Sequence, residues 1–518
     1  MSTPTLTAAP AVQLRAITPP VKVQRAGRRA ELITLRPNGK YGARRARTHE
    51  EREVVSLIQR VRSILADPGF WETATHLPGN TRTVLRASGR PADHPTWVMF
   101  LIAALATQAG SQRAAIALVA DPGFWRYVRD VANHHRPVMF IPAGDKPPAR
   151  HHFSHFLRKW ESPAWREVRT QVIRAGRTYA LEQAKRLGHF NPNDPLEYNR
   201  VRPEQWVTLD GTVYQSPSNR VDAGRCDPAS GWHSKGGAPD GTAYGTKYSI
   251  VETLSDDYYG QLLLSFGHVT PRPGKTQGDE AAASERLLNQ LKKAAPGLRG
   301  AVSDSAFRGP HIRRLTRRGI LILNHPVAAK NPNRLEGGRY ADGRVERTHK
   351  IRTATHKGAH GYECRHTIYL HGSNPCVEAF DENGDTTLVP LVPVGYDHRQ
   401  TKSGHVFYLK VAVECRRGNF TELIRLDQAG TSDVAHAARA DLARFYPVGT
   451  PQFDLLYGRR NTSESFHAKM KRTMPRIPAY GRLRQDLFML GYQVANNAIA
   501  LAFHAQRAGQ PNALDDTR

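Results

Sequence analysis

The stretch from Leu455 to Arg472, LLYGRRNTSESFHAKMKR, sets an acidic side chain among basic ones at helical spacing. A helix turns about 100° per residue, so residues at offsets of three, seven and fourteen from the first fall near one face. That face contains Tyr457, Arg460, Glu464 and Lys471, with His467 beside them. Phe466 and Met470 fall on the opposite face. The stretch predicts an amphipathic helix that packs on one side and presents a carboxylate among cations on the other, although a solvated charged face would have the same spacing.

The same residues fit the pattern Y-x2-R-x3-E-x6-K without a gap. This pattern resembles the signature of bacterial insertion-sequence transposases of the DDE type, in the branch named for these four residues. The resemblance implies that Glu464 is a metal ligand. It also implies that transposon-end DNA is held by the surrounding residues Tyr457, Arg460 and Lys471, with His467 next to them. The family needs two further aspartates upstream.

Two aspartates stand where predicted strands end. QWVTLDGTVY predicts a strand with Asp210 at its end, and RGAVSDSAFRG predicts a strand that ends at Asp304. Taken alone, Asp210-Gly211 is typical of a turn, and Asp304 before a helical pattern is typical of an N-cap. The apolar periods predict strands at 205–214, 245–255, 259–270, 299–304 and 320–325, and helices at 279–294 and 310–319. This order resembles that of an RNase H-like α/β domain, with acids at the ends of its first and fourth strands.

Three carboxylates at such a site would suit phosphodiester chemistry. That chemistry uses two metal ions about 3.5–4 Å apart, one at the attacking oxygen and one at the leaving oxygen. Mg²⁺ prefers carboxylate oxygens, and Mn²⁺ is expected to substitute for it. In the predicted site Asp210 bridges both ions, Asp304 holds one and Glu464 holds the other. The expected reaction is hydrolysis at a transposon end, followed by attack of the freed 3′-hydroxyl on target DNA.

The charge balance favours a nucleic-acid partner. The chain has 74 Lys+Arg against 46 Asp+Glu, a formal charge of +28 that is spread along its length. Arg460 and Lys471 are predicted to contact phosphates, and Lys247 in its strand is a further candidate for such a contact. The expected partners are double-stranded DNA, as terminal inverted repeats and target, and a second copy of the chain, because two ends must be brought together.

Other classes and compartments are disfavoured. The sequence has no run of about 18 apolar residues, so no membrane association is expected. The N-terminus lacks the pattern of a secretion signal, and the 4 cysteines do not form a disulfide framework. We expect a protein of the bacterial cytoplasm, associated with the nucleoid.

Five segments are predicted along the chain. Residues 1–50 form a basic arm, flexible on DNA or simply a disordered leader, and residues 51–200 form a helical DNA-binding domain. Within it, 95–119 has the spacing of a helix-turn-helix, which an ordinary helical hairpin shares. The hexapeptide ADPGFW occurs at 66–71 and 120–125, each time as a predicted helix stop. The catalytic domain is predicted at 201–330 and 441–518, interrupted by a β-rich insertion at 331–440, an insertion for which the resembled branch is known.

Two further features concern the β-rich insertion. Relatives that excise through a DNA hairpin place a flipped base against a Trp there, but no Trp follows Trp232 in this chain. An aromatic that could stack instead would come from Tyr340, Tyr362, Tyr396 or Tyr408, and the hairpin step stays open. A compact group of possible zinc ligands consists of Cys364, His366, His371 and Cys376, although their alternation equally fits a strand and turn.

Three alternative functions fit parts of the sequence. A DNA-binding regulator descended from a transposase would keep the helices and lose the chemistry. A stand-alone RNase H-like nuclease would cut without joining, and a zinc-dependent binding module would need only the Cys and His residues. The presence of all three acids favours the transposase over the first of these.

Overall fold

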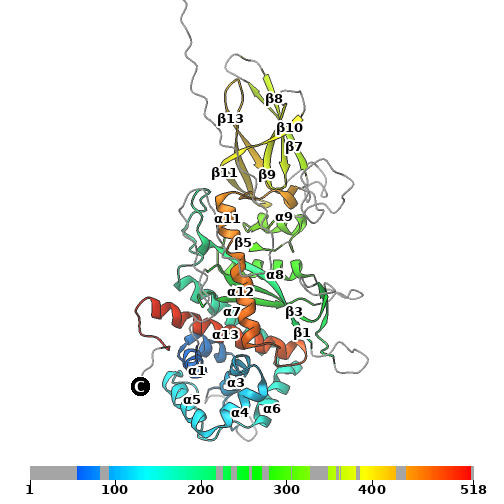
Figure 1. The fold of residues 1–518 in the computed structure, drawn as a ribbon. Helices are drawn as coiled ribbons and strands as arrows, with labels where there is room; N and C mark the ends of the chain where they lie inside the picture. The colour runs from blue at the N-terminus through cyan, green and yellow to red at the C-terminus, as the bar shows by residue number, and fades with distance from the viewer. Residues whose placement is uncertain are drawn as a thin grey trace, which may run out of the picture. The chain divides into compact units, whose positions relative to one another are not determined.

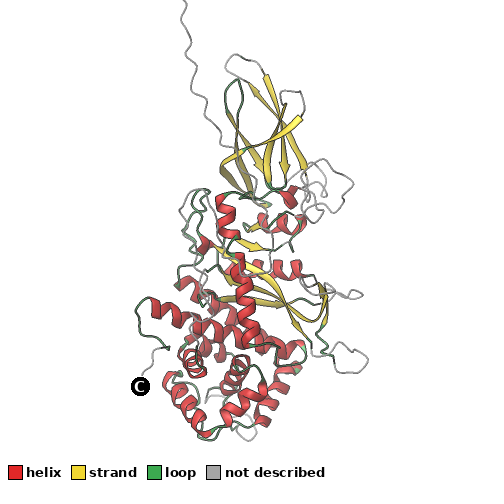
Figure 2. Ribbon diagram, viewed as in Figure 1, coloured by secondary structure: helices red, strands yellow, loops and turns green. Residues whose placement is uncertain are grey.

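The computed structural model describes residues 55–81, 93–216, 226–234, 242–255, 259–270, 279–304, 306–326, 348–357, 361, 363–380, 386–427 and 439–514 (Figure 1 and Figure 2). The predicted basic arm at 1–50 lies outside these residues, as do Tyr340 and Tyr362. The chain from Val55 to Arg518 forms one compact unit, a mixed α/β structure with several sheets.

The repeated hexapeptide ADPGFW forms a corner between two helices. Asp67 and Asp121 each cap the end of one helix and begin the next, and their carboxylates accept hydrogen bonds from the backbone N–H groups of Gly69 and Phe124. A proline follows at the first position of the new helix, where its missing N–H costs nothing. The predicted stop is therefore also a start. The helices joined in this way are α1 (Leu57–Ala66) with α2 (Pro68–Thr75), and α4 (Gln112–Ala120) with α5 (Pro122–His135).

The predicted helical pair at 95–119 is present as α3 (Thr96–Gln108) and α4. Gly110 turns the chain between them with φ +77, a backbone conformation that favours glycine, and Ser111 caps α4. Nearly every side chain of α3 is buried, whereas α4 buries Ala115 and Val119 and leaves its other side outward. Binding of DNA by α4 stays a prediction.

A long C-terminal helix, α13 (Arg482–Arg507), packs against α3. The two helices approach closely at Gly491, where a Cβ atom would lie 3.0 Å from the backbone of Ala104. One hydrophobic core contains Trp97 and Phe100 from α3, Phe488 from α13, and Tyr248 and Ile250 from the sheet described next. The predicted helical and catalytic segments therefore share a core. The remaining N-terminal helices are α6 (Arg150–Glu161), the short 3₁₀ helix Pro163–Trp165, and α7 (Arg166–Arg186).

The main sheet has six strands in the order β2-β3-β1-β5-β6, with β4 also paired to β3. Strand β1 runs antiparallel to β3 and parallel to β5, and β5 runs parallel to β6. The predicted order of strands and helices from 205 to 325 is confirmed, and β2 is an additional short strand that the sequence pattern did not predict. The elements are β1 (Trp206–Gln215), β2 (Gly231–Ser234), β3 (Thr242–Thr253), β4 (Leu263–His268), α8 (Glu280–Ala294), β5 (Gly300–Ser303), α9 (Gly309–Arg317) and β6 (Leu321–Leu323), with a 3₁₀ turn at Pro203–Gln205 before β1.

Amide side chains of α13 bond to the backbone of β4. The N–H of Leu263 donates to Asn497 Oδ1 at 2.8 Å. Gln493 Nε2 donates to the carbonyl oxygens of Leu263 and Leu264 at 2.9 and 3.1 Å. These amides are buried, so their hydrogen bonds satisfy polar groups on both elements. The bonds fix α13 along the sheet.

The predicted β-rich insertion consists of two antiparallel sheets, in the order β10-β9-β8-β7 and β11-β12-β13 (Figure 2). Their apolar faces share a core with Trp206 and Val302 of the main sheet. Among the described helices, none is long and apolar enough to traverse a bilayer. The strands are β7 (Thr348–Lys357), β8 (Glu363–His371), β9 (Asn374–Phe380), β10 (Thr386–Pro390), β11 (Val392–Thr401), β12 (Gly404–Val413) and β13 (Phe420–Arg425).

Candidate active site

The Tyr-Arg-Glu-Lys pattern lies on two helices, α11 (Pro451–Tyr457) and α12 (Arg460–Thr473) (Figure 1). The prediction of one continuous helix was wrong at Gly458 and Arg459. Glycine weakens a helix, and here the N–H of Arg459 bonds to the carbonyl oxygen three residues back, at Leu456, which tightens the turn. The predicted packing side of α12 is confirmed, because Phe466 and Met470 are fully buried.

The two aspartates are neighbours on adjacent parallel strands. Leu209 of β1 pairs with Ser303 of β5, and Asp210 and Asp304 are the residues that follow this pair in the two segments. Asp304 directly follows β5, as predicted. Asp210 is not at the end of its strand, because β1 continues to Gln215 through its antiparallel pairing with β3. It stands instead where the parallel pairing with β5 stops, which explains why the two side chains share one edge of the sheet.

Helix α12 packs on β1, and its Arg460 lies between the third acid, Glu464, and Asp304. One guanidinium nitrogen of Arg460 lies 3.5 Å from a carboxylate oxygen of Asp304 and 3.3 Å from one of Glu464. Burial lowers the pKa of Arg460, but the charges of Asp304, Asp210 and Glu464 outweigh this and raise it. The carboxylates of Asp304 and Glu464 are 58% and 60% exposed, so they face solvent beside their shared cation.

A buried pair stands behind Asp210. His467 Nδ1 lies 3.6 Å from the Asp210 carboxylate, and its Nε2 lies 3.5 Å from Glu252, which is fully buried on β3. Ser463 Oγ also donates to Glu252 at 3.2 Å. Burial lowers the pKa of His467, but its close contact with the Glu252 carboxylate and the charge of Asp210 raise it overall. His467 was predicted to lie beside the DNA-facing residues, and here it is buried and positions Asp210.

Lys247 is held by Glu280 at the start of α8, and the two form an ion pair. The pair lies over Gly211, next to Asp210, where a Cβ atom would come within 2.7 Å of Lys247 Cε. Gly211 therefore provides room for the pair rather than a turn. Lys247 is 15% exposed and is partly turned away from solvent. Its charge is therefore partly neutralised by Glu280.

Tyr457 and Lys471 occupy different parts of the helix pair. The Tyr457 ring stacks on Phe453 at 5.0 Å and meets His325 edge-on at 4.6 Å, with the Arg460 guanidinium 6.0 Å from its centroid. Burial raises the pKa of Tyr457. The ring therefore supports Arg460. Lys471 is half-buried and lies two turns beyond Glu464, roughly 10 Å along the helix axis, so it is separated from the acids.

Glu252 and Glu280 were missed from the sequence. Glu252 carried a local signal, since it is a carboxylate inside the apolar strand pattern YSIVETL. Glu280 carried none, because an acidic residue in the first turn of a helix is common. Of the aromatics proposed for stacking, Tyr396 donates its hydroxyl to the carbonyl of Leu196, and Tyr408 has the Arg399 guanidinium 5.1 Å from its ring centroid.

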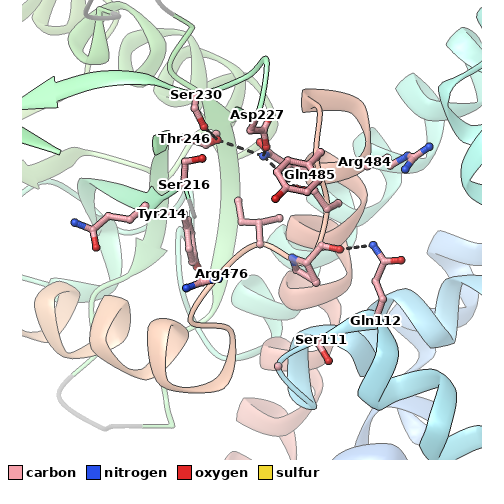
Figure 3. A pocket seen from close by; sticks show the side chains of 16 residues that line it. Ser111, Gln112, Tyr214, Ser216, Asp227, Ser230, Thr246, Arg476, Arg484 and Gln485 are labelled. Carbon is pink, nitrogen blue, oxygen red and sulfur yellow. Dashed lines mark hydrogen bonds between the residues drawn. The ribbon is translucent and has the colours of Figure 1, made fainter. Parts of the chain in front are cut away.

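A separate cavity of about 350 Å³, lined by both polar and apolar residues, lies between α4, the end of β1 and the chain that leads into α13 (Figure 3). Asp227 accepts hydrogen bonds there from the backbone N–H of Gly481 at 3.0 Å and from the Gln485 amide. Gln112 donates to the carbonyl of Pro478. None of the three predicted acids lines this cavity. Its polar groups join the helices to the sheet, which makes it a structural joint.

The donor types of the three acids fit a hard divalent cation, but their carboxylate oxygens do not all lie within 4.8 Å of one another in this structure. Asp210, Asp304 and Glu464 offer carboxylate oxygens, which Mg²⁺ and Mn²⁺ prefer, and the Arg460 guanidinium already places positive charge between two of them. A cation bound by Asp304 and Glu464 would have to displace that guanidinium.

No protein-family model matches the chain, and no curated protein matches it.

Proposed function

We propose that this chain is a DDE transposase, which cleaves DNA at transposon ends and joins the freed ends to target DNA. One observation carries the proposal: Asp210 on β1 and Asp304 directly after β5 follow the last paired residues of these two strands, and Glu464 of α12 lies against the same guanidinium that pairs with Asp304. The Tyr-Arg-Glu-Lys signature and the charge of +28 support it independently.

The proposed fold of the catalytic part is RNase H-like. In its support, the sheet combines antiparallel β1, β3 and β4 with parallel β1, β5 and β6, and α8 and α9 connect β4 to β5 and β5 to β6. In such a topology the parallel strands end at one edge, and acids placed there converge. The β-rich sheets between β6 and α11 fit the insertion of the same transposase branch.

In the proposed mechanism Asp210, Asp304 and Glu464 would hold two Mg²⁺ ions, for which Mn²⁺ would substitute. When bound, the ions supply activation of the attacking oxygen and stabilisation of the leaving oxygen. Arg460 exchanges its two carboxylates for the DNA backbone, because a guanidinium binds phosphate oxygens in a bidentate manner. The buried pair of His467 and Glu252 keeps Asp210 in place while the charge around it changes.

The proposed partners follow from this chemistry. The substrates are the terminal inverted repeats of the element and a target duplex, both held mainly through phosphates. Two ends must be cut together, so a homodimer is the proposed working form, associated with the bacterial nucleoid in the cytoplasm. Tyr457 would act by supporting Arg460, and Lys471 would contact phosphate further along the duplex.

The test is cleavage and joining of plasmid DNA that carries the flanking sequence of the element, with Mg²⁺, Mn²⁺ or EDTA. The variants are Asp210→Ala, Asp304→Ala and Glu464→Ala, with Asp130→Ala as the control. Asp130 is 59% exposed and lies on α5, so it matches Asp304 in exposure but not in place. Each site variant should lose cleavage while electrophoretic mobility shows that it still binds DNA, and Asp130→Ala should cut normally.

Other results would overturn parts of the proposal. Binding of the ends without cutting by the unaltered chain, under either metal, would identify a DNA-binding regulator. Metal-dependent cutting without joined products would identify a nuclease. Cutting that survives in all three site variants would remove the acid cluster from the chemistry.

A further inference from the structure

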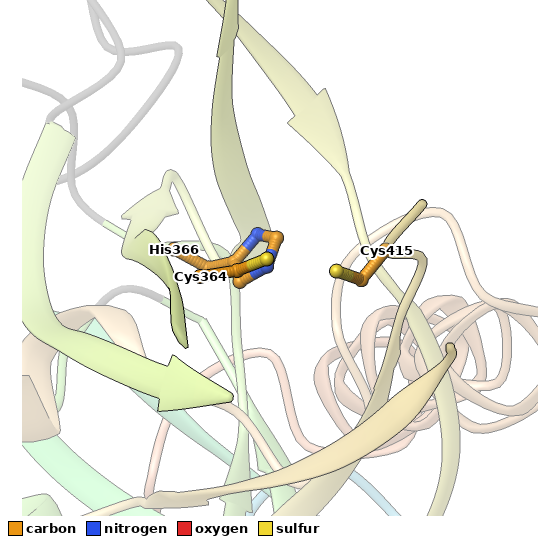
Figure 4. Close-up of side chains that lie close together, drawn as sticks. All are labelled: Cys364, His366 and Cys415. Carbon is orange, nitrogen blue, oxygen red and sulfur yellow. The ribbon is translucent and has the colours of Figure 1, made fainter. Parts of the chain in front are cut away.

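Two cysteines and a histidine meet where the sheets of the β-rich region approach each other (Figure 4). Cys364 and His366 lie on β8 of one sheet, and Cys415 lies in the turn between β12 and β13 of the other. Their sulfur and nitrogen atoms all lie within 4.8 Å of one another. Within the described part of the chain, no other three His, Cys, Asp or Glu residues meet this closely.

This group differs from the four residues that the sequence predicted. Cys364 and His366 are two apart on one strand and share a face, whereas His371 falls on the other face and bonds to Thr348 at 2.9 Å. Cys376 is buried on β9 and donates toward the carbonyl of Asn374. The partner of the first two is Cys415, which lies far along the chain and could not be paired with them from spacing.

A second histidine borders the group. His356 on β7 stands directly opposite Cys364 in the β7–β8 ladder, so the two side chains share a face. The Phe420 ring stacks on the His356 ring at 4.6 Å and lies 5.3 Å from the His366 ring. Phe420 therefore packs against both imidazoles. His356 Nδ1 and His366 Nε2 are buried and have no hydrogen-bond partner. Unpaired ring nitrogens beside two thiols are costly unless a ligand uses them.

The turn that carries Cys415 is shaped around its sulfur. The N–H of Arg417 points to Cys415 Sγ at 3.5 Å, and the N–H of Gly418 bonds to the Cys415 carbonyl at 3.0 Å. Gly418 has φ +111, which favours glycine. Asn419 accepts from the Cys415 N–H at 3.2 Å. These hydrogen bonds fix the turn and hold the Cys415 sulfur toward β8.

We propose that Cys364, Cys415 and His366 bind one Zn²⁺, with His356 as the fourth ligand, and that this ion joins the two sheets of the β-rich region. Zn²⁺ prefers sulfur at about 2.3 Å and imidazole nitrogen at about 2.0–2.1 Å in a tetrahedron. Such a site separates its ligand atoms by roughly 3.3–3.8 Å, so Cys364, Cys415 and His366, which lie within 4.8 Å of one another, need to move only slightly closer. His356 lies outside this spacing and would turn toward the ion about its side-chain bonds. Binding releases the two thiol protons to solvent and leaves a site of zero net charge.

The role of this site is structural and independent of the acid cluster. All four positions are filled by protein, as in structural zinc sites, so none is left for a substrate. The ion would connect β7 and β8 to the β12–β13 turn. The competing product of the same geometry is a disulfide between Cys364 and Cys415, which a reducing compartment would disfavour.

The test uses the full chain purified without chelator, with zinc measured by elemental mass spectrometry. One zinc per chain is expected. Cys415→Ser should bring this close to zero, and His356→Ala should weaken zinc retention. Cys376→Ser is the matched control, because it removes a cysteine of the same region outside the group, and it should keep its zinc.

A second measurement avoids dependence on the folding of the variants. The unaltered chain is stripped with a zinc-selective chelator and titrated with Co²⁺, whose thiolate charge-transfer and tetrahedral d–d bands should rise to one equivalent. Absence of those bands would overturn the proposal, as would zinc that stays in Cys415→Ser. A Cys364–Cys415 disulfide found by peptide mapping of freshly lysed, alkylated cells would overturn it in favour of a covalent link.

Discussion

Asp67 and Asp121 are the same residue of the repeated hexapeptide in two different environments. Both cap a helix through the same kind of hydrogen bond, but Asp67 is 7% exposed whereas Asp121 is exposed. The Asp67 carboxylate also accepts from the buried Gln183 amide at 3.0 and 3.2 Å. Burial raises the pKa of Asp67 from 3.8 to about 6, despite these hydrogen bonds. Replacing each with asparagine therefore isolates the effect of burying the charge.

The expected magnitude follows from that pKa. The unfolded carboxyl loses its proton near 3.8, and the folded one loses it near 6. Between these values the folded state holds more protons, so the free energy of unfolding falls as the pH rises, by roughly 3 kcal/mol in total. Above pH 6 that stability stays lost. An asparagine side chain in the same place cannot ionise, and it caps a helix about as well as aspartate.

We expect Asp67→Asn to be more stable than the unaltered chain at pH 7.5. The variant avoids the cost of roughly 3 kcal/mol for the buried charge and loses about 1 kcal/mol because the asparagine amide hydrogen-bonds less well, which leaves a gain of about 2 kcal/mol. The side-chain amide of Gln183 can flip, so that its oxygen accepts a hydrogen bond from the new NH₂ group. At pH 4 the variant should be equal or slightly less stable. Asp121→Asn should stay within about 0.5 kcal/mol at both pH values, as is usual for exposed positions.

Urea unfolding followed by tryptophan fluorescence measures this difference, since Trp71 lies on α2 beside Asp67. The comparison needs both variants at both pH values. A stability difference for Asp67→Asn that is the same at pH 4 and pH 7.5 would show that the carboxyl is not strained by burial. A loss of stability at pH 7.5 would show that the charge itself is needed for the cap.

Three further changes probe the site and the sheet. Arg460→Met should tighten Mn²⁺ binding about 3–10-fold in calorimetry. The reason is that the Arg460 guanidinium, whose pairing with the exposed carboxylates is worth about 1 kcal/mol, no longer competes with the metal ion. Weaker Mn²⁺ binding by the variant would contradict this competition. Glu252→Ala should lower the free energy of unfolding by about 3–5 kcal/mol, because the buried imidazole of His467 loses its partner. A loss below about 1 kcal/mol would argue against the pair. Gly300→Ala should lower the free energy of unfolding by about 1–3 kcal/mol, because the new Cβ atom would clash with the Trp206 ring. The control is Gly144→Ala, whose new Cβ atom would have no other atom within 4 Å and which should leave the thermal midpoint unchanged.

Local patterns accounted for the elements and for one of the aspartates. The strand and helix order from 205 to 325 follows from alternation, from helical periods and from caps such as Asp279, all of which act within a few residues. Asp304 could be placed because β5 ends directly before it. The position of Asp210 could not, since it depends on where β5 stops pairing with β1, which is a contact between distant segments.

The partners of the site residues were beyond local patterns. Glu252 and His467 are more than 200 residues apart in the chain, and Glu280 meets Lys247 only because α8 begins over β3. The group around Cys364 needed Cys415, from another sheet. The break at Gly458 had a local signal in the low helix propensity of glycine, but the pattern of four matching residues outweighed it. The other misses each concern a pairing that the tertiary structure decides.

The amides of α13 on β4 have a consequence for how copies of the chain can meet. A free strand edge is a template on which another chain can add a strand, the first step to fibres and to unplanned dimers. At Leu263 the backbone N–H and carbonyl already bond to Asn497 and Gln493. That stretch of the edge is closed to strand addition. Removal of these amides would expose an edge of β4 on which another chain could add a strand, so Asn497 and Gln493 protect the chain against aggregation as well as fixing α13.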